Sequence, residues 1–340
     1  MPAPQLLPRN QVTHFYRGGR RIAAFRGGDP EGGPRRPEEW IASMTTMTSE
    51  PERGLSRLRD GTLLRDAVAA DPAGWLGPSH VDSFGASTEL LVKLLDAGQR
   101  LPVHLHPDRA FARQHLGLPH GKTEAWIILD VDEGARVRLG FTEPMARERL
   151  RAMVDAGDSD ELVRSLRACD ARPGDAVLVP AGVPHCIDAG VFLLELQEPT
   201  DLSIVLEAED MPIEPSRDGH LGLGFDVALD AVRLDALDPS GLDRLVVRRE
   251  QVDRSALAAL LPADAGPYFR AHRAVDGTTV EAGFAVLVVI TGVASLVPSS
   301  GDLLTVKRGD AVVVPYAAGP WRLEGPVEAV VCRPPEPAQP

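Results

Sequence analysis

Cysteine is scarce in this chain of 340 residues, which contains only three, at Cys169, Cys186 and Cys332. Their number is odd, and they lack the close spacing of cysteines that bind a metal. This argues against a disulfide framework and favours small buried thiols in a reducing compartment.

Positive charge is also in short supply, since 36 Lys and Arg face 49 Asp and Glu, giving a net charge of -13. Nucleic-acid binding depends on clustered basic side chains, so we expect no nucleic-acid partner. No stretch approaches the roughly 20 apolar residues that span a bilayer, and the first residues lack the apolar core of a signal peptide. We expect a cytoplasmic protein without a membrane partner, either a monomer or a homodimer.

Short apolar runs separated by Gly and Pro dominate the pattern of the chain. Strands are predicted at 90–95, 127–129, 136–140, 176–180, 191–196 and 203–206. Helical spacing of apolar residues appears at 55–75 and again within 142–168. The pattern predicts a mainly β protein, built as a barrel or sandwich with short helical insertions.

An internal repeat indicates two related barrels. Residues 172–180, RPGDAVLVP, recur at 307–315 as KRGDAVVVP. The copies differ where chemistry is expected, because Pro320 stands at the position that corresponds to His185, and His272 is the only histidine near the second copy. We therefore predict a metal-binding first barrel and a second barrel without metal.

The domain boundaries follow from this division. We predict an N-terminal lead-in and cover over 1–80, packed on the first barrel. The metal-binding barrel covers 81–207, with a helical insertion at 142–168. A connector at 208–261 leads to the second barrel at 262–335.

The predicted metal site lies in the stretch from Leu101 to Trp126. His104 and His106 are two residues apart, so on a strand both side chains point to the same face. Glu124 follows in a strand-like context, and His185 comes after a Pro/Gly turn. Neutral imidazoles and one carboxylate suit a divalent metal, with Zn, Fe, Mn, Ni and Co all compatible.

Three segments carry a family resemblance: LVKLLDAGQRLPVHLHPD, GKTEAW and RPGDAVLVPAGVPHCIDAGVFLLELQ. They resemble the type I phosphomannose isomerases (mannose-6-phosphate isomerases) of the cupin superfamily, in their short bacterial form. KRGDAVVVPYAAGPWRLEG resembles the closing barrel of these enzymes. The resemblance implies two cupin (jelly-roll) barrels and one metal per chain, usually zinc. It also implies interconversion of an aldose phosphate and a ketose phosphate.

The resemblance also assigns roles to single residues. His106, Glu124 and His185 match the family's zinc ligands, and His104 replaces a glutamine. Lys122, of the GKTE motif, matches a lysine placed beside the metal. Glu195 matches an acidic residue in the strand after the last ligand. We predict Lys122 and Glu195 to be the catalytic residues.

One departure from the family affects the expected substrate. The family has an arginine in a segment resembling SDTTYR, whereas this chain reads TDLSIVLE, with Val205 or a neighbour at that place. A guanidinium is the group best suited to binding phosphate through paired hydrogen bonds.

The function predicted is a metal-dependent aldose–ketose isomerase that acts on a sugar or a sugar phosphate through an enediol(ate). The alternatives are an isomerase for an unphosphorylated sugar, a cupin oxygenase and a non-catalytic sugar-binding protein with two cupin barrels.

Overall fold

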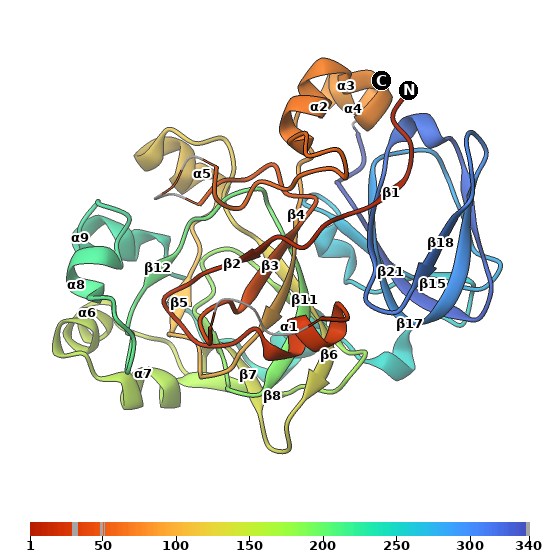
Figure 1. Ribbon diagram of the computed structural model, residues 1–340. Helices are drawn as coiled ribbons and strands as arrows, with labels where there is room; N and C mark the ends of the chain where they lie inside the picture. The colour runs from red at the N-terminus through yellow and green to blue at the C-terminus, as the bar shows by residue number, and fades with distance from the viewer. Residues whose placement is uncertain (29–32, 48–49, 51, 338–340) are drawn as a thin grey trace.

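Two antiparallel β-barrels lie side by side in the computed structural model, which describes residues 1–28, 33–47, 50 and 52–337 (Figure 1). The prediction of a mainly β protein with two cupin barrels and short helical insertions is confirmed. Among the described residues, no helix is both long enough and apolar enough to span a bilayer.

The first barrel is built from two sheets. Its larger sheet has seven strands in the order β13-β9-β6-β11-β4-β3-β2. These strands are β2 Gln11–Val12, β3 Glu38–Ile41, β4 Leu91–Asp96, β6 Glu124–Val131, β9 Ala176–Val179, β11 Val191–Gln197 and β13 Val246–Val247. The opposite sheet has the order β12-β5-β10-β7-β8. Its strands are β5 His104–Leu105, β7 Arg136–Phe141, β8 Leu166–Asp170, β10 His185–Ile187 and β12 Ile204–Val205.

The second barrel has one long strand, β17 Ala285–Pro298, that bends from one side of the barrel to the other. One side has the order β1-β19-β17-β21-β15-β14, and the other joins β16, β18 and β20 to β17. The remaining strands are β1 Gln5–Leu6, β14 Leu257–Ala259, β15 Arg270–Val275, β16 Thr279–Val280, β18 Leu304–Lys307, β19 Ala311–Val314, β20 Trp321–Glu324 and β21 Val327–Arg333.

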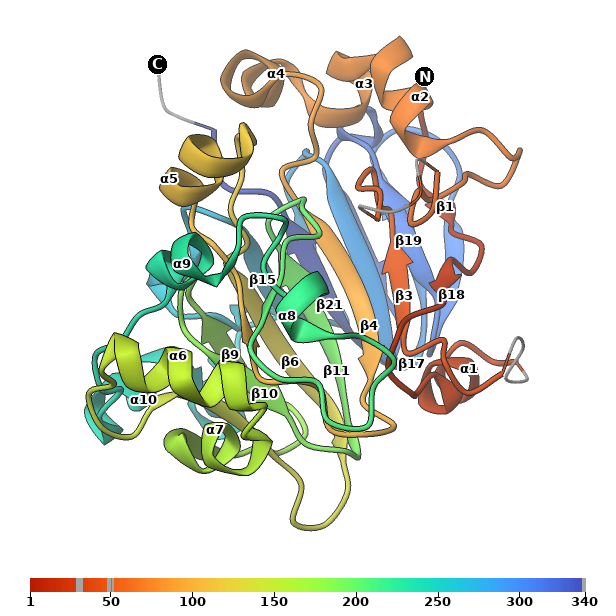
Figure 2. The same cartoon turned by 90° about the vertical axis from the view of Figure 1, so that its left-hand side faces the viewer.

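Short helices cover the two barrels (Figure 2). The α-helices are α1 Arg20–Phe25, α2 Leu64–Ala70, α3 Pro72–Leu76, α4 Pro78–Phe84, α5 Arg109–Phe111, α6 Arg147–Ala156, α7 Ser159–Ser165, α8 Pro215–Asp218, α9 Phe225–Ala228 and α10 Pro239–Leu245. Single turns of other helix types are η1 Ala112–Leu116, η2 Leu229–Ala231, η3 Arg249–Gln251, η4 Ala263–Ala265 and η5 Tyr316–Ala318. Helices α6 and α7 lie between β7 and β8, and β8 begins at the residue after Ser165.

The N-terminal lead-in and the connector both contribute strands to the barrels. β1 extends the second barrel, whereas β2 and β3 extend the first. β13, in the connector, pairs with β9 of the first barrel. These strands come from segments with little apolar alternation, so pairing with an existing sheet, and not local propensity, decides their conformation.

The internal repeat appears as the same set of backbone contacts in both barrels. In the first, β9 pairs with β6, and Ile128 N–H donates to Asp175 O at 2.9 Å. In the second, β19 pairs with β17, and Val289 N–H donates to Asp310 O at 3.0 Å. The two copies of the repeat therefore have the same register, which allows positions in the two barrels to be equated.

In the described part of the chain, apolar side chains form five buried clusters, of which three lie inside or between the barrels. One group, with Trp126, lies inside the first barrel, and another, with Trp321, lies inside the second. The largest group lies between the barrels, where Leu94 of β4 and Val286 of β17 belong to one buried cluster. The large shared core holds the barrels against each other.

The repeat provides a stability prediction, because its two aspartates differ in burial and in partners. The Asp175 side chain is buried and accepts from Arg248 Nη1 at 2.6 Å and from Arg249 N–H at 3.0 Å. Asp175→Ala leaves the Arg248 guanidinium without its carboxylate and should lower the free energy of unfolding by about 2–3 kcal/mol. Urea unfolding would measure this loss.

Asp310→Ala is the matched control in the second barrel. Among the described residues, the Asp310 side chain accepts only from Lys307 N–H, at 2.9 Å, so its loss should be below about 1 kcal/mol. Equal losses in the two variants would show that the ion pair with Arg248 does not hold the connector to the first barrel.

Candidate metal centre

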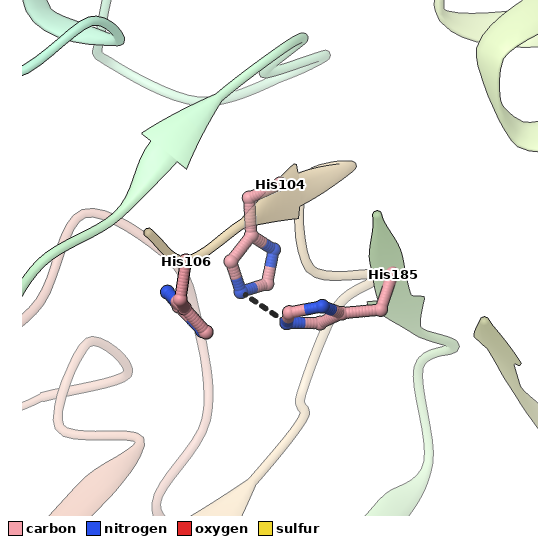
Figure 3. A group of neighbouring side chains, drawn as sticks. All are labelled: His104, His106 and His185. Atoms are coloured by element: carbon pink, nitrogen blue, oxygen red, sulfur yellow. Dashed lines mark hydrogen bonds between the residues drawn. The ribbon is translucent and has the colours of Figure 1, made fainter. Parts of the chain in front are cut away.

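Three histidines meet inside the first barrel at the end of two neighbouring strands (Figure 3). His104 of β5 lies directly opposite His185 of β10, and their Nε2 atoms are 3.0 Å apart. His106 follows two residues later, on the same face as expected, and the candidate ligand atoms of the three side chains all lie within 4.8 Å of one another. The structure thus brings together the three histidines that the sequence singled out.

Each imidazole is oriented by a backbone carbonyl. The three Nδ1 atoms lie 2.8, 2.7 and 2.9 Å from Pro102 O, Leu202 O and Val183 O, for His104, His106 and His185 respectively. A carbonyl oxygen only accepts, so each Nδ1 carries the proton and each Nε2 keeps its lone pair. This is the arrangement by which outer hydrogen bonds orient histidines that bind a metal.

Glu124 adds an oxygen to the same point. Its Oε2 lies 2.9 Å from His106 Nε2, and its Oε1 lies 3.4 Å from His185 Nε2 and accepts from Trp126 Nε1 at 2.9 Å. Oε2 is buried and forms no hydrogen bond with the described residues, and the Lys122 ammonium lies 3.4 Å from it. Two lone-pair atoms facing each other at this distance repel unless a cation lies between or beside them.

The protonation states agree with a set of ligands. Burial lowers the pKa of His104, His106 and His185 to about 3, so all three are neutral at pH 7. Burial alone would raise the pKa of Glu124, but the neighbouring His106 and Lys122 bring it well below its usual range. Neutral imidazoles beside an ionised carboxylate are the forms that bind a metal.

The spacing of the donor atoms is close to the spacing of ligands around a divalent metal ion. Nitrogen and oxygen atoms that share one divalent metal at about 2.0–2.2 Å lie roughly 3.0–3.5 Å from one another. His106 Nε2 lies 2.9 Å from Glu124 Oε2. The Nε2 atoms of His104 and His185 are 3.0 Å apart, and His185 Nε2 lies 3.4 Å from Glu124 Oε1. The residues present therefore fit a divalent metal with three nitrogen ligands and one oxygen ligand.

Lys122 lies beside this group. Its Nζ is 3.1 Å from His106 Nε2 and 3.4 Å from Glu124 Oε2, and its side chain is buried. The backbone N–H of Lys122 donates to Pro107 O at 2.9 Å, which fixes the turn that carries the GKTE motif. A single ammonium group is thus held at the edge of the donor cluster and faces the adjoining pocket.

A pocket of about 510 Å³, a volume that includes its open mouth, lies beside the donor cluster. It is lined by four residues predicted for the site, His104, Lys122, Glu124 and Glu195. It is also lined by residues that the sequence did not indicate, among them His14, Phe15, Tyr16, Glu38, Lys93, Asp201 and Ser203. The N-terminal segment therefore supplies one wall of the pocket.

Lys93 and Glu38 form a buried charged network at this wall. Lys93 Nζ lies 3.3 Å from Glu38 Oε2 and 3.5 Å from Glu195 Oε1. Glu38 also accepts from the Tyr16 hydroxyl and, at 2.7 Å, from Trp40 Nε1. Burial alone would lower the pKa of Lys93, but the two carboxylates raise it above its usual value. The one sequence signal for this network was a lysine inside the apolar strand LLVKLL, since a buried lysine needs partners.

Glu195 differs from Glu124 in its charge state. Burial raises the pKa of Glu195 to about 7, even though Lys93 lies nearby. Its Oε1 is buried and forms no hydrogen bond with the described residues, although the Lys93 ammonium lies 3.5 Å away. Glu195 is therefore close to half-ionised at neutral pH, which is the state that suits a group that both takes up and releases a proton.

Val205 and Ser203 lie on the pocket wall in the segment where the resembling family has its arginine. Among the described residues, no arginine lines this pocket. Its lysines are Lys93, between two carboxylates, and Lys122, beside Glu124. The positive charges of the pocket thus already have carboxylate partners.

The fold and this site define the class of the protein: a two-barrel cupin whose first barrel holds three histidines that could bind a metal, with Glu124 beside them. No family model matches the chain. Mannose-6-phosphate isomerase ManA of Bacillus subtilis is 30% identical over 247 residues, which cover 71% of this chain and 74% of the relative. Mannose-6-phosphate isomerase of Streptococcus mutans is 25% identical over 336 residues, 96% of this chain and 98% of the relative.

Solved structures agree on the fold. The mannose 6-phosphate isomerase of Bacillus subtilis superposes with a TM-score of 0.76 at 22% identity, covering 98% of this chain and 100% of the other. The apo form of the mannose 6-phosphate isomerase of Salmonella typhimurium superposes with a TM-score of 0.73 at 17% identity, covering 99% of this chain and 100% of the other. The chain belongs to the mannose-6-phosphate isomerase family and is a sugar isomerase, which confirms the resemblance seen in the sequence.

Proposed function

We propose that the protein is a metal-dependent aldose–ketose isomerase that holds one divalent metal, most simply zinc, on His104, His106, Glu124 and His185. The observation that supports the proposal is a buried group of three histidines whose candidate ligand atoms lie within 4.8 Å of one another, with Glu124 Oε2 2.9 Å from His106 Nε2. When bound, the metal would supply Lewis-acid polarisation of the sugar's oxygen atoms.

Two residues of the pocket carry out the proton transfers of the reaction. Glu195 takes the proton from C2 of the aldose and returns it to C1, which moves the carbonyl from C1 to C2 through an enediol. Lys122 donates a proton to O1 as that carbonyl becomes a hydroxyl, and it recovers the proton that O2 releases. Lys93 and Glu38 hold Glu195 in place from the opposite side. The apolar barrel around them excludes water.

Glu195 should set the acid limb of the pH profile. A base must be ionised, so kcat/KM should fall as the pH drops below about 7, the value to which burial raises the pKa of Glu195. Glu195→Gln cannot take the proton, so its residual activity should be lower by about 10²-fold or more and should lack this limb. Steady-state rates between pH 5 and 9 would test this. An unchanged acid limb in Glu195→Gln would assign the limb to another group.

Two kinds of substrate are candidates, a sugar phosphate and a free sugar. The names of the relatives point to mannose 6-phosphate. The pocket favours a second candidate, an aldose without a phosphate, because both pocket lysines are already paired and Val205 and Ser203 stand in the segment of the missing arginine. A neutral sugar needs only hydrogen bonds from such a pocket, whereas a phosphate dianion needs charge as well.

Rates on paired substrates test both candidates. The metal-loaded protein would be assayed with mannose 6-phosphate and with mannose, and kcat/KM compared. A ratio above about 100 in favour of the phosphate would identify a sugar-phosphate isomerase, and a ratio below one would identify a free-sugar isomerase. Conversion of neither sugar, nor of other hexoses and pentoses in either form, would overturn the proposed function.

A further inference from the structure

The mouth of the second barrel carries a group of basic side chains. Arg270 at the start of β15 lies directly opposite Arg333 at the end of β21. Like charges at directly opposite positions of an antiparallel pair destabilise a sheet. An arrangement that places two guanidinium groups side by side therefore needs a compensating anion.

Both arginines project toward the inside of the barrel. Opposite residues share a face, and the next pairs on this face are His272 with Val331 and Ala274 with Ala329. Val331, Ala274 and Ala329 belong to the buried core of the second barrel. The arginines are thus the polar end of an otherwise apolar interior.

The position corresponds to the metal-centre end of the first barrel. In the first barrel, Glu124 of β6 pairs with Val179 of β9 and with Gln197 of β11. In the second, Ala285 of β17 pairs with Val314 of β19. Arg333 follows Cys332, the partner of Val286, and so lies beside Ala285. Arg333 therefore occupies the place of Gln197, and the two barrels have polar groups at the same end.

Arg333 is the least satisfied of these groups. Its Nη2 donates to Ala282 O at 3.0 Å, and its Nε is buried and has no partner. None of its contacts in the described chain is an ion pair at 4.0 Å or less. Burial, together with Arg270, lowers the pKa of Arg333 to about 10. A largely buried guanidinium without a carboxylate costs free energy unless another anion binds.

The backbone is shaped around this group. Gly283 lies so close to Arg333 that a β-carbon there would overlap Nη2, and a β-carbon on Gly77 would overlap the Tyr316 ring at 2.6 Å. Both glycines line a cleft of about 650 Å³, including its open mouth, with Arg270, Arg333, Ser79 and Tyr316. The end of the chain runs beside the same cleft, near α4, and contributes Pro334 and Pro337 (Figure 2).

Glu336 shows that Arg270 accepts an anionic partner. Its carboxylate lies 2.6 Å from Arg270 Nη1, and the side chain of Glu336 is 72% exposed. It neutralises Arg270 from the solvent side and leaves Arg333 without a close partner. We propose that the mouth of the second barrel is a binding site for a phosphate group, held between Arg270 and Arg333 in competition with Glu336.

A phosphate fits this position better than a carboxylate. It offers three oxygen atoms and nearly two negative charges at neutral pH, enough for both guanidinium groups. The hydroxyl-bearing side chains of Ser79 and Tyr316 line the same cleft. The site would take inorganic phosphate or the phosphate of a small metabolite, and it is separate from the metal centre of the first barrel.

Calorimetric titration of the whole protein with inorganic phosphate tests the proposal. Arg333→Gln should weaken phosphate binding at least tenfold, because a glutamine cannot form a charge-assisted pair. Arg270→Gln should do the same and serves if Arg333→Gln does not fold. Arg322→Gln, an exposed arginine of the same barrel, should bind phosphate like the parent.

Glu336→Gln should change the affinity for phosphate in the opposite direction. Removal of the competing carboxylate should strengthen phosphate binding several-fold, and this exposed side chain is not needed for folding. Parallel titrations with a sugar phosphate and with the same free sugar show whether the site takes inorganic phosphate or a phosphorylated metabolite. A site for metabolites should bind the sugar phosphate more tightly than inorganic phosphate. No phosphate binding, or equal binding by the parent and by the Arg333, Arg270 and Glu336 variants, would overturn the proposal.

Discussion

His106→Ala should purify with less than about a tenth of the metal held by the parent protein, and its isomerase activity should fall to background. Its Nε2 is 2.9 Å from Glu124 Oε2, and its Nδ1 is fixed by Leu202 O. Removal of one of four ligands breaks the set that holds the ion. Elemental analysis after dialysis, with activity measured on the same samples, would give both quantities.

Two histidine variants serve as controls. His120→Ala should keep its metal, because His120 Nε2 contacts Glu89 Oε2 at 2.9 Å and does not line the pocket. His104→Gln should keep part of its metal, since the amide oxygen of glutamine is a weaker ligand at the same place. Full metal content in His106→Ala would contradict the assignment of this residue as a ligand.

Lys122→Met should bind metal as the parent protein does, but its kcat should be lower by about 10²–10⁴-fold. The Lys122 ammonium lies beside the donor cluster and lines the pocket, so it can reach a sugar oxygen without being a ligand. Loss of a positioned proton donor gives a reduction of this size. Metal content, kcat and KM would be measured together.

Lys307→Met is the matched control, since Lys307 is exposed on β18 of the second barrel and should leave both quantities unchanged. Metal loss in Lys122→Met equal to that in His106→Ala would show that the lysine holds the centre together and takes no part in turnover.

The histidine cluster could be predicted from the sequence because its signals are local. His104 and His106 are two residues apart on a strand, and His185 follows a repeated turn and strand whose second copy has Pro320 instead. The repeat also gave the two-barrel fold, because both copies place a strand beside the same partner. Short-range periodicity and self-similarity were sufficient for these features.

The charged network behind the pocket could not be predicted in the same way. Glu38 and Lys93 are brought together by the pairing of β3 with β4, and Tyr16 reaches Glu38 from an irregular segment. Nothing in the local pattern of residues 1–40 indicates which sheet they join. The buried lysine was visible in the sequence, but its partners depend on tertiary structure.

The basic group in the second barrel was missed for the same reason. Arg270 and Arg333 are far apart in the sequence, and only the register of β15 with β21 places them opposite each other. From the sequence, each arginine is most simply interpreted as a solvated surface charge. The boundaries proposed for the domains, 1–80, 81–207, 208–261 and 262–335, stay predictions.

Oxygen uptake separates the isomerase from the cupin oxygenase, the alternative that uses the same donor set. Three histidines and one glutamate also suit iron that reacts with dioxygen. Stoichiometric Fe(II) together with oxygen consumption would favour that alternative. A protein that binds a sugar but converts none would instead be the non-catalytic alternative.

The most direct test of the central claim is a coupled assay of mannose 6-phosphate and fructose 6-phosphate interconversion, run in parallel with mannose and fructose. It would compare the protein as purified, after chelation, and after reloading with zinc. The account predicts conversion of at least one pair, its loss on chelation and its return with the metal. Conversion that persists in the metal-free protein, or no conversion in the reloaded protein, would contradict it.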